Sequence, residues 1–118
     1  MGSQAPAVSV LMPVHNGERF VEDAVNSILL QTFDDFELII TDDGSTDRTL
    51  EIISGLAAKD RRIRLIHNSR CQGISKTLNK AARQARGSLI ARIDSDDWAH
   101  ETRFSFQIDA FRQAENLV

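Results

Sequence analysis

The chain has 118 residues, of which 42% are hydrophobic and 26% are charged, the balance of an ordinary globular domain. Its 14 Lys and Arg residues are outnumbered by 17 Asp and Glu residues, so the net charge of -3 gives no electrostatic reason to expect nucleic acid as a partner. The single cysteine excludes an internal disulfide, and no stretch of this portion is long and apolar enough to be a transmembrane segment.

The first six residues, Met1-Gly2-Ser3-Gln4-Ala5-Pro6, have the composition of a disordered lead-in or a remnant of cloning. We expect the domain to occupy residues 7–118. Short β-rich runs then recur along the chain. They predict strands over Val8–Met12, which Pro13 would end, and over Phe36–Thr41, Ile63–His67 and Leu89–Ile93.

Apolar residues at helical spacing predict a helix after each of these strands. The four stripes are Val21, Val25, Ile28 and Leu29; Leu50, Ile53 and Ala57; Ile74, Leu78, Ala81, Ala82 and Ala85; and Phe104, Ile108 and Phe111. We expect Ser45, Thr46 and Asp47 to cap the second helix and Gly87 to end the third. The alternation predicts a three-layer α/β/α fold, a mostly parallel sheet with helices on both faces.

Two of the predicted strands end in carboxylates. Asp94-Ser95-Asp96-Asp97 follows one of them, and Asp42-Asp43-Gly44-Ser45 follows another. Ligands of parallel sheets bind outside the carboxyl ends of the strands, so residues 13–16, 42–43 and 94–97 are expected around one crevice. Clustered carboxylates persist at low cost when a cation or water neutralises them, which indicates a divalent metal. Solvated or structural acidic turns are the alternative at both places.

Five segments, taken together in this order and at these spacings, resemble the signatures of the inverting glycosyltransferase family 2, which has the GT-A fold. They are Pro13-Val14-His15-Asn16, Ser27–Phe33, Thr41–Asp47, Asn79 and Ala91–Asp97. The resemblance covers nearly all of the chain from Val8 onward. It departs from the family at His15, where members usually carry Tyr. It implies the Rossmann-like, nucleotide-sugar-binding half of a hexosyltransferase of polysaccharide biosynthesis.

The resemblance also implies roles for individual residues. Mn²⁺ or Mg²⁺ would be held at the DxD-type motif by Asp96 and Asp97, with Asp94 closer to the ribose or to a metal-bound water, and would neutralise the leaving diphosphate. Asp43 lies where members contact the base, and an ionised carboxylate accepts the ring N–H of uracil or guanine, so a UDP-sugar or a GDP-sugar fits. By analogy with the family, in which UDP is the commonest donor, a UDP-sugar is favoured. Of the two neighbouring acids, Asp42 is the better candidate for a structural cap.

The expected substrate-binding residues lie on the three acidic or turn segments and on the helix that follows the third strand. Lys76, on that helix, stands where a cation can reach a phosphate, with a solvated surface position as the alternative. The full set is Pro13, Val14, His15, Asn16, Asp43, Lys76, Asp94, Ser95 and Asp96.

The residues that would complete catalysis are expected elsewhere. Inversion needs a general base on the acceptor hydroxyl, and in the family this carboxylate lies well downstream of the acidic motif, so we expect it beyond Val118. The chain is then the donor-binding part of a longer protein, inactive alone, with self-association through apolar surface at its truncated edge. For the full-length protein we expect a glycan or glycolipid acceptor and a cytoplasmic location, with peripheral association at the inner face of the membrane left open.

Two other functions stay open on the sequence. One is a non-catalytic nucleotide-binding module. The other is a receiver-like signalling domain, which also alternates strands and helices around an acidic pocket. Such a domain requires a late lysine beside that pocket, whereas the last lysine here, Lys80, precedes the final predicted strand.

Overall fold

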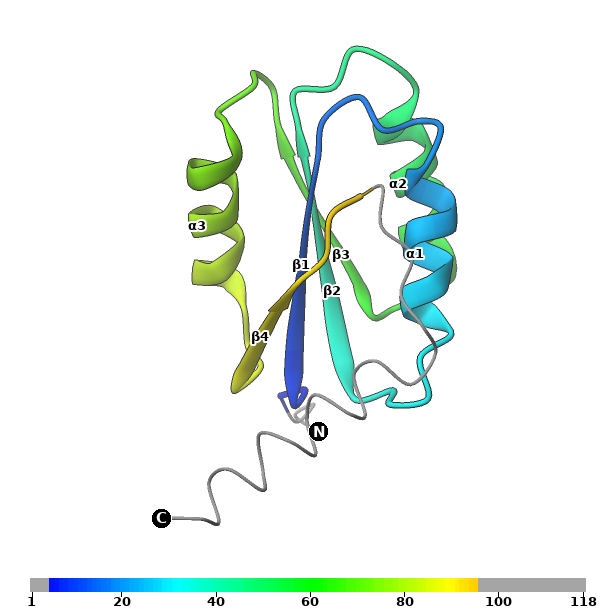
Figure 1. Ribbon diagram of the computed structural model, residues 1–118, viewed down its shortest axis with the longest axis vertical. Coiled ribbons are helices and arrows are strands. Elements are labelled where there is room, and N and C mark those ends of the chain that lie inside the picture. Colours follow the sequence, from blue (N-terminus) through cyan, green and yellow to red (C-terminus); the bar gives the residue numbers. More distant parts are fainter. Residues whose placement is uncertain (1–4, 96–118) are drawn as a thin grey trace.

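The computed structural model describes residues 5–95 as a parallel sheet covered on both faces. The strands are β1 (Val8–Val14), β2 (Phe36–Asp43), β3 (Ile63–Asn68) and β4 (Leu89–Arg92). The helices are α1 (Val21–Leu29), α2 (Thr49–Lys59) and α3 (Ile74–Gln84). Figure 1 shows α3 on one face of the sheet and α1 and α2 on the other, which confirms the three-layer α/β/α prediction.

The strand order is β3-β2-β1-β4, so the chain builds outward from β1 and then returns across it to place β4. This is the order in which Rossmann-type sheets begin, and ligands of such sheets bind where the order reverses. In receiver-type folds the third strand lies next to the first, whereas β3 here lies at the far edge beside β2. The receiver-like alternative is therefore wrong.

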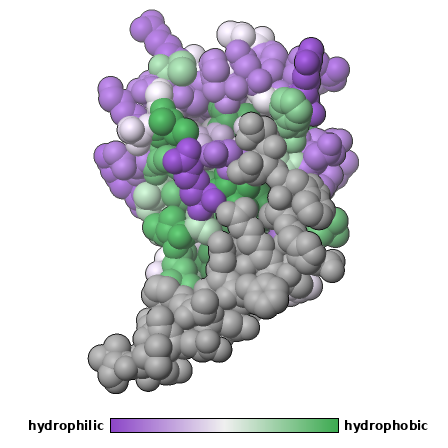
Figure 2. Space-filling view, in the orientation of Figure 1, coloured by the Kyte–Doolittle hydropathy of each residue, from purple (hydrophilic) through white to green (hydrophobic). Residues whose placement is uncertain are grey.

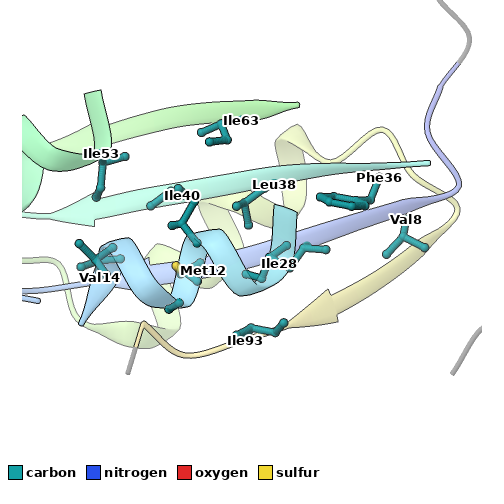
Figure 3. Packing of buried hydrophobic residues seen from close by; sticks show 14 residues of the cluster. Val8, Met12, Val14, Ile28, Phe36, Leu38, Ile40, Ile53, Ile63 and Ile93 are labelled. Carbon is teal, nitrogen blue, oxygen red and sulfur yellow. The ribbon is translucent and has the colours of Figure 1, made fainter. Parts of the chain in front are cut away.

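The hydrophobic core lies in two layers, one on each face of the sheet. Met12, Leu38 and Ile40 point toward α1 and α2, where they pack with Ile28 and Ile53 (Figure 3). The smaller layer under α3 consists of Leu11, Ile39, Ile66 and Ala81. Every residue of β2 is buried, as expected for an interior strand that is covered on both faces. Among residues 5–95, no helix has the length and apolar character needed to cross a membrane.

Strand β1 continues past the predicted stop at Pro13, which pairs with Thr41 of β2 in the register of the sheet. The reason lies in the other neighbour of β1. Leu11 pairs with the last residue of β4, and its carbonyl accepts a bond from Ile93. Backbone groups two residues apart in a strand point the same way, so the missing N–H of Pro13 faces the side on which the β4 ladder has ended. Strand β2 likewise runs two residues beyond its predicted end, to Asp43.

The prediction that Gly87 ends α3 is wrong. The helix ends at Gln84, and Ala85 already has an extended backbone. Gly87 instead lies against β1, where an added Cβ would stand 2.6 Å from the Ser9 nitrogen. Its N–H donates to the Ser9 hydroxyl at 2.8 Å.

Two residues of the apolar stripe predicted for this helix, Ile74 and Ala82, are exposed. The last predicted helix, around Phe104 to Phe111, lies outside the described residues.

A buried carboxylate stabilises the end of the sheet opposite the site. Glu37 accepts bonds from the hydroxyl of Ser9, from Arg64 at 2.7 Å, and from the backbone and side chain of Arg86 at 2.7 and 3.2 Å. Burial alone raises the pKa of Glu37, but the hydrogen bonds from Ser9, Arg86 and Arg64 outweigh burial and hold it at about 2. This cluster joins β1, β2, β3 and the connection that leads into β4.

Candidate functional site

The loops that follow β1 and β2 are bonded to each other at the carboxyl end of the sheet, which lies at the top of Figure 1. The backbone N–H of Asn16 donates to the Ser45 hydroxyl at 2.8 Å, and the Thr46 N–H donates to Asn16 Oδ1 at 2.8 Å. Asn16 has a positive φ of 52°, which Asn tolerates better than most residues. Ser45 and Thr46 therefore hold this loop pair, and of the three predicted caps only Asp47 bonds the start of α2, through the Thr49 N–H at 2.9 Å.

His15 lies between these loops and a small cavity. Its Nδ1–H donates to the backbone carbonyl of Asp43 at 2.8 Å, which fixes the imidazole at the end of β2. The residue itself is exposed. The space-filling view shows mostly hydrophilic residues along this end of the molecule (Figure 2). The imidazole is thus held through Nδ1 while the residue stays exposed to solvent.

The carboxylate of Asp43 is the most heavily bonded group at this edge of the sheet. Its Oδ1 accepts from the Gln72 N–H at 2.7 Å and from Asn68 Nδ2 at 3.0 Å. Its Oδ2 accepts from the Gly73 N–H at 3.0 Å and from the Cys71 thiol at 3.4 Å. Burial raises the pKa of this carboxyl, but the bonds from Gln72, Asn68, Cys71 and Gly73 outweigh burial and hold the pKa at about 2. Asp43 is therefore ionised at neutral pH.

The cavity beside Asp43 has a volume of about 200 Å³. Sites for drug-sized ligands start at about 300 Å³, so this one suits a single ring of a larger ligand. Four of the predicted substrate-binding residues meet in its lining, and the rest of the lining comes from the loop after β3 and the start of α3. The lining is Pro13, Val14, His15, Asp43, Cys71, Gly73, Ile74 and Thr77.

The sequence analysis did not assign Asn68 or Cys71, which follow or end β3 beside this cavity, to the site. One signal was available. Asn68 ends β3, and the carboxyl ends of parallel strands meet at one edge. In the structure Asn68 is the register partner of Asp43. Gly44, with φ of +69°, lies so close to the β3 loop that a Cβ would stand 2.5 Å from the Cys71 nitrogen. Contact between the two loops at this point requires glycine.

Asp42 points to the opposite face of the sheet from Asp43 and is not the cap that the sequence suggested. It is fully buried, and among residues 5–95 neither of its carboxylate oxygens has a hydrogen-bond partner. His67 is its register partner on β3, and His67 Nε2 lies 3.6 Å from Asp42 Oδ2. The alternation of side chains along β2 thus places one carboxylate at the cavity and buries the other beneath the α1 and α2 layer.

The start of the acidic segment after β4 lies beside the β1 loop. A Cβ on Gly17 would stand 3.5 Å from the Ser95 hydroxyl. Asp94 forms an ion pair with Arg92 at 3.1 Å, and both side chains are about half exposed. Asp96 and Asp97, the predicted metal ligands, lie outside the described residues. Within residues 5–95 no three His, Cys, Asp or Glu side chains are grouped closely enough to hold a metal ion.

Lys76 is not among the residues that line the cavity of Asp43. It lines a second, larger cavity on α3 together with Asn68 and Lys80. Asn68 connects the two places, because its amide donates to Asp43 while its Oδ1 accepts from Lys80 Nζ at 2.8 Å.

Comparison with known proteins identifies the family. A sequence model described as "Glycosyl transferase family 2" matches residues 9–118, a span that contains both acidic strand ends and the cavity of Asp43. The chain belongs to this family. The glycosyltransferase EpsJ of Bacillus subtilis is 39% identical over 99 residues, which are 84% of this chain and 28% of EpsJ. The chain thus spans less than a third of the length of this relative.

Solved structures agree with this assignment. Staphylococcus aureus TarS (residues 1–349) superimposes with a TM-score of 0.82 at 28% identity, covering 90% of this chain and 32% of that one. A complex of the same TarS segment with UDP matches equally well. The mannosyltransferase PcManGT of Pyrobaculum calidifontis, in complex with GDP-Man and Mn²⁺, has a TM-score of 0.74 at 25% identity over 81% of this chain and 29% of its own. The Rossmann-like GT-A fold expected from the sequence is therefore confirmed.

Proposed function

We propose that this family 2 chain binds the nucleotide-sugar donor of a glycosyl transfer reaction, a UDP-sugar, with the base in the cavity beside Asp43. The observation that carries the proposal is that three strong donors and one weak donor bond the Asp43 carboxylate. A carboxylate offers about four acceptor positions. Two backbone N–H groups and the Asn68 amide take three of them, and the weak thiol donor of Cys71 takes the fourth.

A ring N–H is a stronger donor than a thiol and can replace Cys71 at Asp43 Oδ2. Uracil and guanine carry such an N–H on the pairing edge. Adenine and cytosine present an acceptor there, which an ionised carboxylate repels. Since the pKa of Asp43 is about 2, the carboxylate stays an acceptor throughout the physiological range. The UDP complex of TarS supports uracil as the base.

The loop after β1 supplies the other contacts of the nucleoside. We assign the open face of the His15 imidazole to stacking on the base or ribose, since Nδ1 is already held by the Asp43 carbonyl. Pro13 and Val14 line the cavity wall. Asn16 acts through the two bonds that fix the loop. We assign Ser95 and Asp94 to the ribose side of the nucleoside, because Ser95 lies beside Gly17 of this loop.

The acidic segment fits a divalent cation by the chemistry of its donors. Three carboxylates in four residues, Asp94, Asp96 and Asp97, follow a strand whose end lies beside the β1 loop. Mg²⁺ and Mn²⁺ are hard cations that bind carboxylate and phosphate oxygens. We assign Asp96 and Asp97 as the ligands of Mn²⁺ or Mg²⁺, which would supply positive charge to the leaving diphosphate when bound. The Mn²⁺ complex of PcManGT supports metal use.

The acceptor and the cellular location rest on the sequence and the family alone. We retain a glycan or glycolipid as the acceptor, polysaccharide biosynthesis as the process and the cytoplasm as the location. No general base is assigned among residues 5–95, and the acceptor site is assigned to other parts of the protein.

Base selection tests the proposal. UDP and GDP should bind at least about tenfold more tightly than ADP and CDP, because adenine and cytosine would place a hydrogen-bond acceptor against the Asp43 carboxylate. Asp43→Ala should weaken UDP binding by about 1.5 to 3 kcal/mol and reduce the ratio of UDP to ADP affinity. The matched control is Asp35→Ala, at an exposed acid before β2. Equal binding of ADP and UDP by the unmodified protein would refute the role of Asp43, and circular dichroism separates loss of binding from loss of fold.

A further inference from the structure

A second cavity, of about 490 Å³, lies on α3 next to the end of β3. Three basic side chains and three amides line it: Lys76, Lys80, Arg83, Asn68, Gln72 and Asn79. The basic residues are spaced four and three apart on α3, so they share one face of the helix. Helix α3 contains no acidic residue, although acids outnumber bases in the chain as a whole. The lining of this cavity is thus positively charged, although the net charge of the chain is -3.

The helix dipole explains only one of these three cations. Cations stabilise the carboxyl end of a helix, which accounts for Arg83 in the last turn, but they are unfavourable in the first turn, where Lys76 lies. In the described part of the chain, neither Lys76 nor Arg83 forms an ion pair. The ammonium of Lys80 donates to a neutral amide oxygen, that of Asn68, at 2.8 Å. Among residues 5–95, none of these three positive charges is paired with a carboxylate, so each can attract an external anion.

We propose that this cavity binds an anionic glycan, a sugar chain that carries carboxylate or phosphate groups. The basic side chains would pair with its charges, and the amides of Gln72 and Asn79 would bond its hydroxyls. A volume of about 490 Å³ holds more than one sugar ring. A membrane surface is less suited as the occupant, because the lining is concave and contains no aromatic or aliphatic residue that could enter a lipid layer.

This site is separate from the donor cavity and does not rest on the donor assignment. Asn68 stands between the two, with its amide nitrogen on Asp43 and its oxygen on Lys80. Lys80 and Asn68 therefore affect both places, whereas Arg83, at the far end of α3, lines the second cavity alone. Arg83 is the residue whose replacement tests the glycan site without touching the donor site.

The test measures binding of tetragalacturonate, which has one carboxylate per sugar, by calorimetry on the full chain. Neutral maltotetraose serves as the uncharged probe of equal length. Arg83→Glu should weaken tetragalacturonate binding by about tenfold, since one attraction becomes a repulsion, and leave UDP binding unchanged. The matched control is Arg61→Glu, which makes the same change of charge at an exposed residue before β3 and should change neither affinity. If Arg83→Glu lowers the melting temperature, Arg83→Gln replaces it, with about a threefold loss expected.

Several results would overturn the proposal. They are equal binding of the charged and neutral tetrasaccharides, equal loss in the Arg61→Glu control, and inorganic phosphate binding as tightly as tetragalacturonate. Arg83-dependent binding to phosphatidylglycerol vesicles without binding of tetragalacturonate would assign the surface to a membrane instead. Failure of UDP to bind the unmodified protein would contradict the donor assignment and leave this site standing.

Discussion

Asn68 and Asp43 are register partners at the carboxyl ends of β3 and β2, and a hydrogen bond of 3.0 Å joins Asn68 Nδ2 to Asp43 Oδ1. Both side chains are almost fully buried. Asn68 Oδ1 accepts in turn from Lys80, so the amide is fixed in the orientation that presents its nitrogen to the carboxylate. The position of Asp43 in the cavity is therefore set by the neighbouring strand as much as by its own.

Replacing this amide with a carboxylate should damage the donor site. Asn68→Asp places a second negative charge beside Asp43 and removes a donor, so UDP binding should fall by about tenfold or more, with a loss of stability of about 2 kcal/mol. The same chemical change at the exposed Asn26 of α1 is the control and should leave both quantities unchanged. Calorimetry with UDP and thermal melts measure them. Undiminished UDP binding by Asn68→Asp would show that Asp43 does not contact the base.

Cys71 should be dispensable for binding yet able to block it. Cys71→Ala removes the weak donor at Asp43 Oδ2 and should leave the UDP affinity within about twofold. Alkylation of the unmodified protein with iodoacetamide adds bulk at the cavity wall and should abolish binding. The reaction is specific, because Cys71 is the one cysteine of the chain. The Ala variant treated in the same way should still bind UDP, and a loss there would locate the effect elsewhere.

Two glycines are expected to respond to alanine in opposite directions. Gly44→Ala introduces a Cβ 2.5 Å from the Cys71 nitrogen at a φ of +69°, so it should destabilise the protein by about 2 kcal/mol and weaken UDP binding. Gly55→Ala, inside α2 with open space around its Cβ, should stabilise it by about 0.5 to 1 kcal/mol. Urea unfolding gives both values. Equal effects of the two changes would contradict the close contact of the loops after β2 and β3.

The buried Glu37 should make stability depend on pH in a defined window. Its pKa is lowered from 4.5 to about 2, which corresponds to about 3 kcal/mol of stability at neutral pH. Because the folded-state pKa is the lower one, this contribution is complete above about pH 5 and is lost as the pH falls from 4.5 toward 2. Glu37→Gln should therefore be less stable than the unmodified protein at pH 7, and the difference should shrink below pH 4.

Glu51→Gln is the matched control for Glu37, since the ion pair of Glu51 with Arg48 is largely exposed. It should change the free energy of unfolding by less than about 0.5 kcal/mol at any pH. Urea unfolding at a series of pH values measures all three proteins. A constant difference between Glu37→Gln and the unmodified protein from pH 7 to pH 3 would show that the Glu37 carboxylate does not carry this stability.

The sequence was sufficient for the layers of the fold, because strands and helices alternate and each helix has an apolar stripe. It was insufficient for the ends of the strands. Pro13 predicts the end of β1, and the strand continues through it because the pairing of β1 with β4 has already ended at Leu11. Gly87 reads as a helix terminator, whereas the close approach of Ser9, 78 residues earlier in the chain, explains it. Such contacts depend on register, which the sequence does not display.

The site was predicted in outline for a similar reason. The clustering of Asp43 with His15 at one edge follows from parallel strands. Which of Asp42 and Asp43 faces the cavity depends on the pleat of β2, and a strand buried on both faces shows no polar alternation from which to read it. The family resemblance, rather than periodicity, singled out Asp43. The position of Asn68 at this edge also follows from parallel strands, but the bonds of Asn68 and Cys71 to Asp43 required the structure, because the partners lie more than 20 residues apart in the chain.

In the proposed function, the chain holds a nucleoside diphosphate both at Asp43 and through a divalent cation at Asp96 and Asp97. Calorimetric titration with UDP, in Mn²⁺ and then in excess chelator, tests it most directly. We expect UDP to bind in both conditions and at least about tenfold more tightly with Mn²⁺, because the diphosphate reaches the carboxylates only through the cation. Asp97→Asn should remove the Mn²⁺-dependent part and keep the remainder. Equal UDP affinity in Mn²⁺ and in chelator would show that no cation links the diphosphate to Asp96 and Asp97.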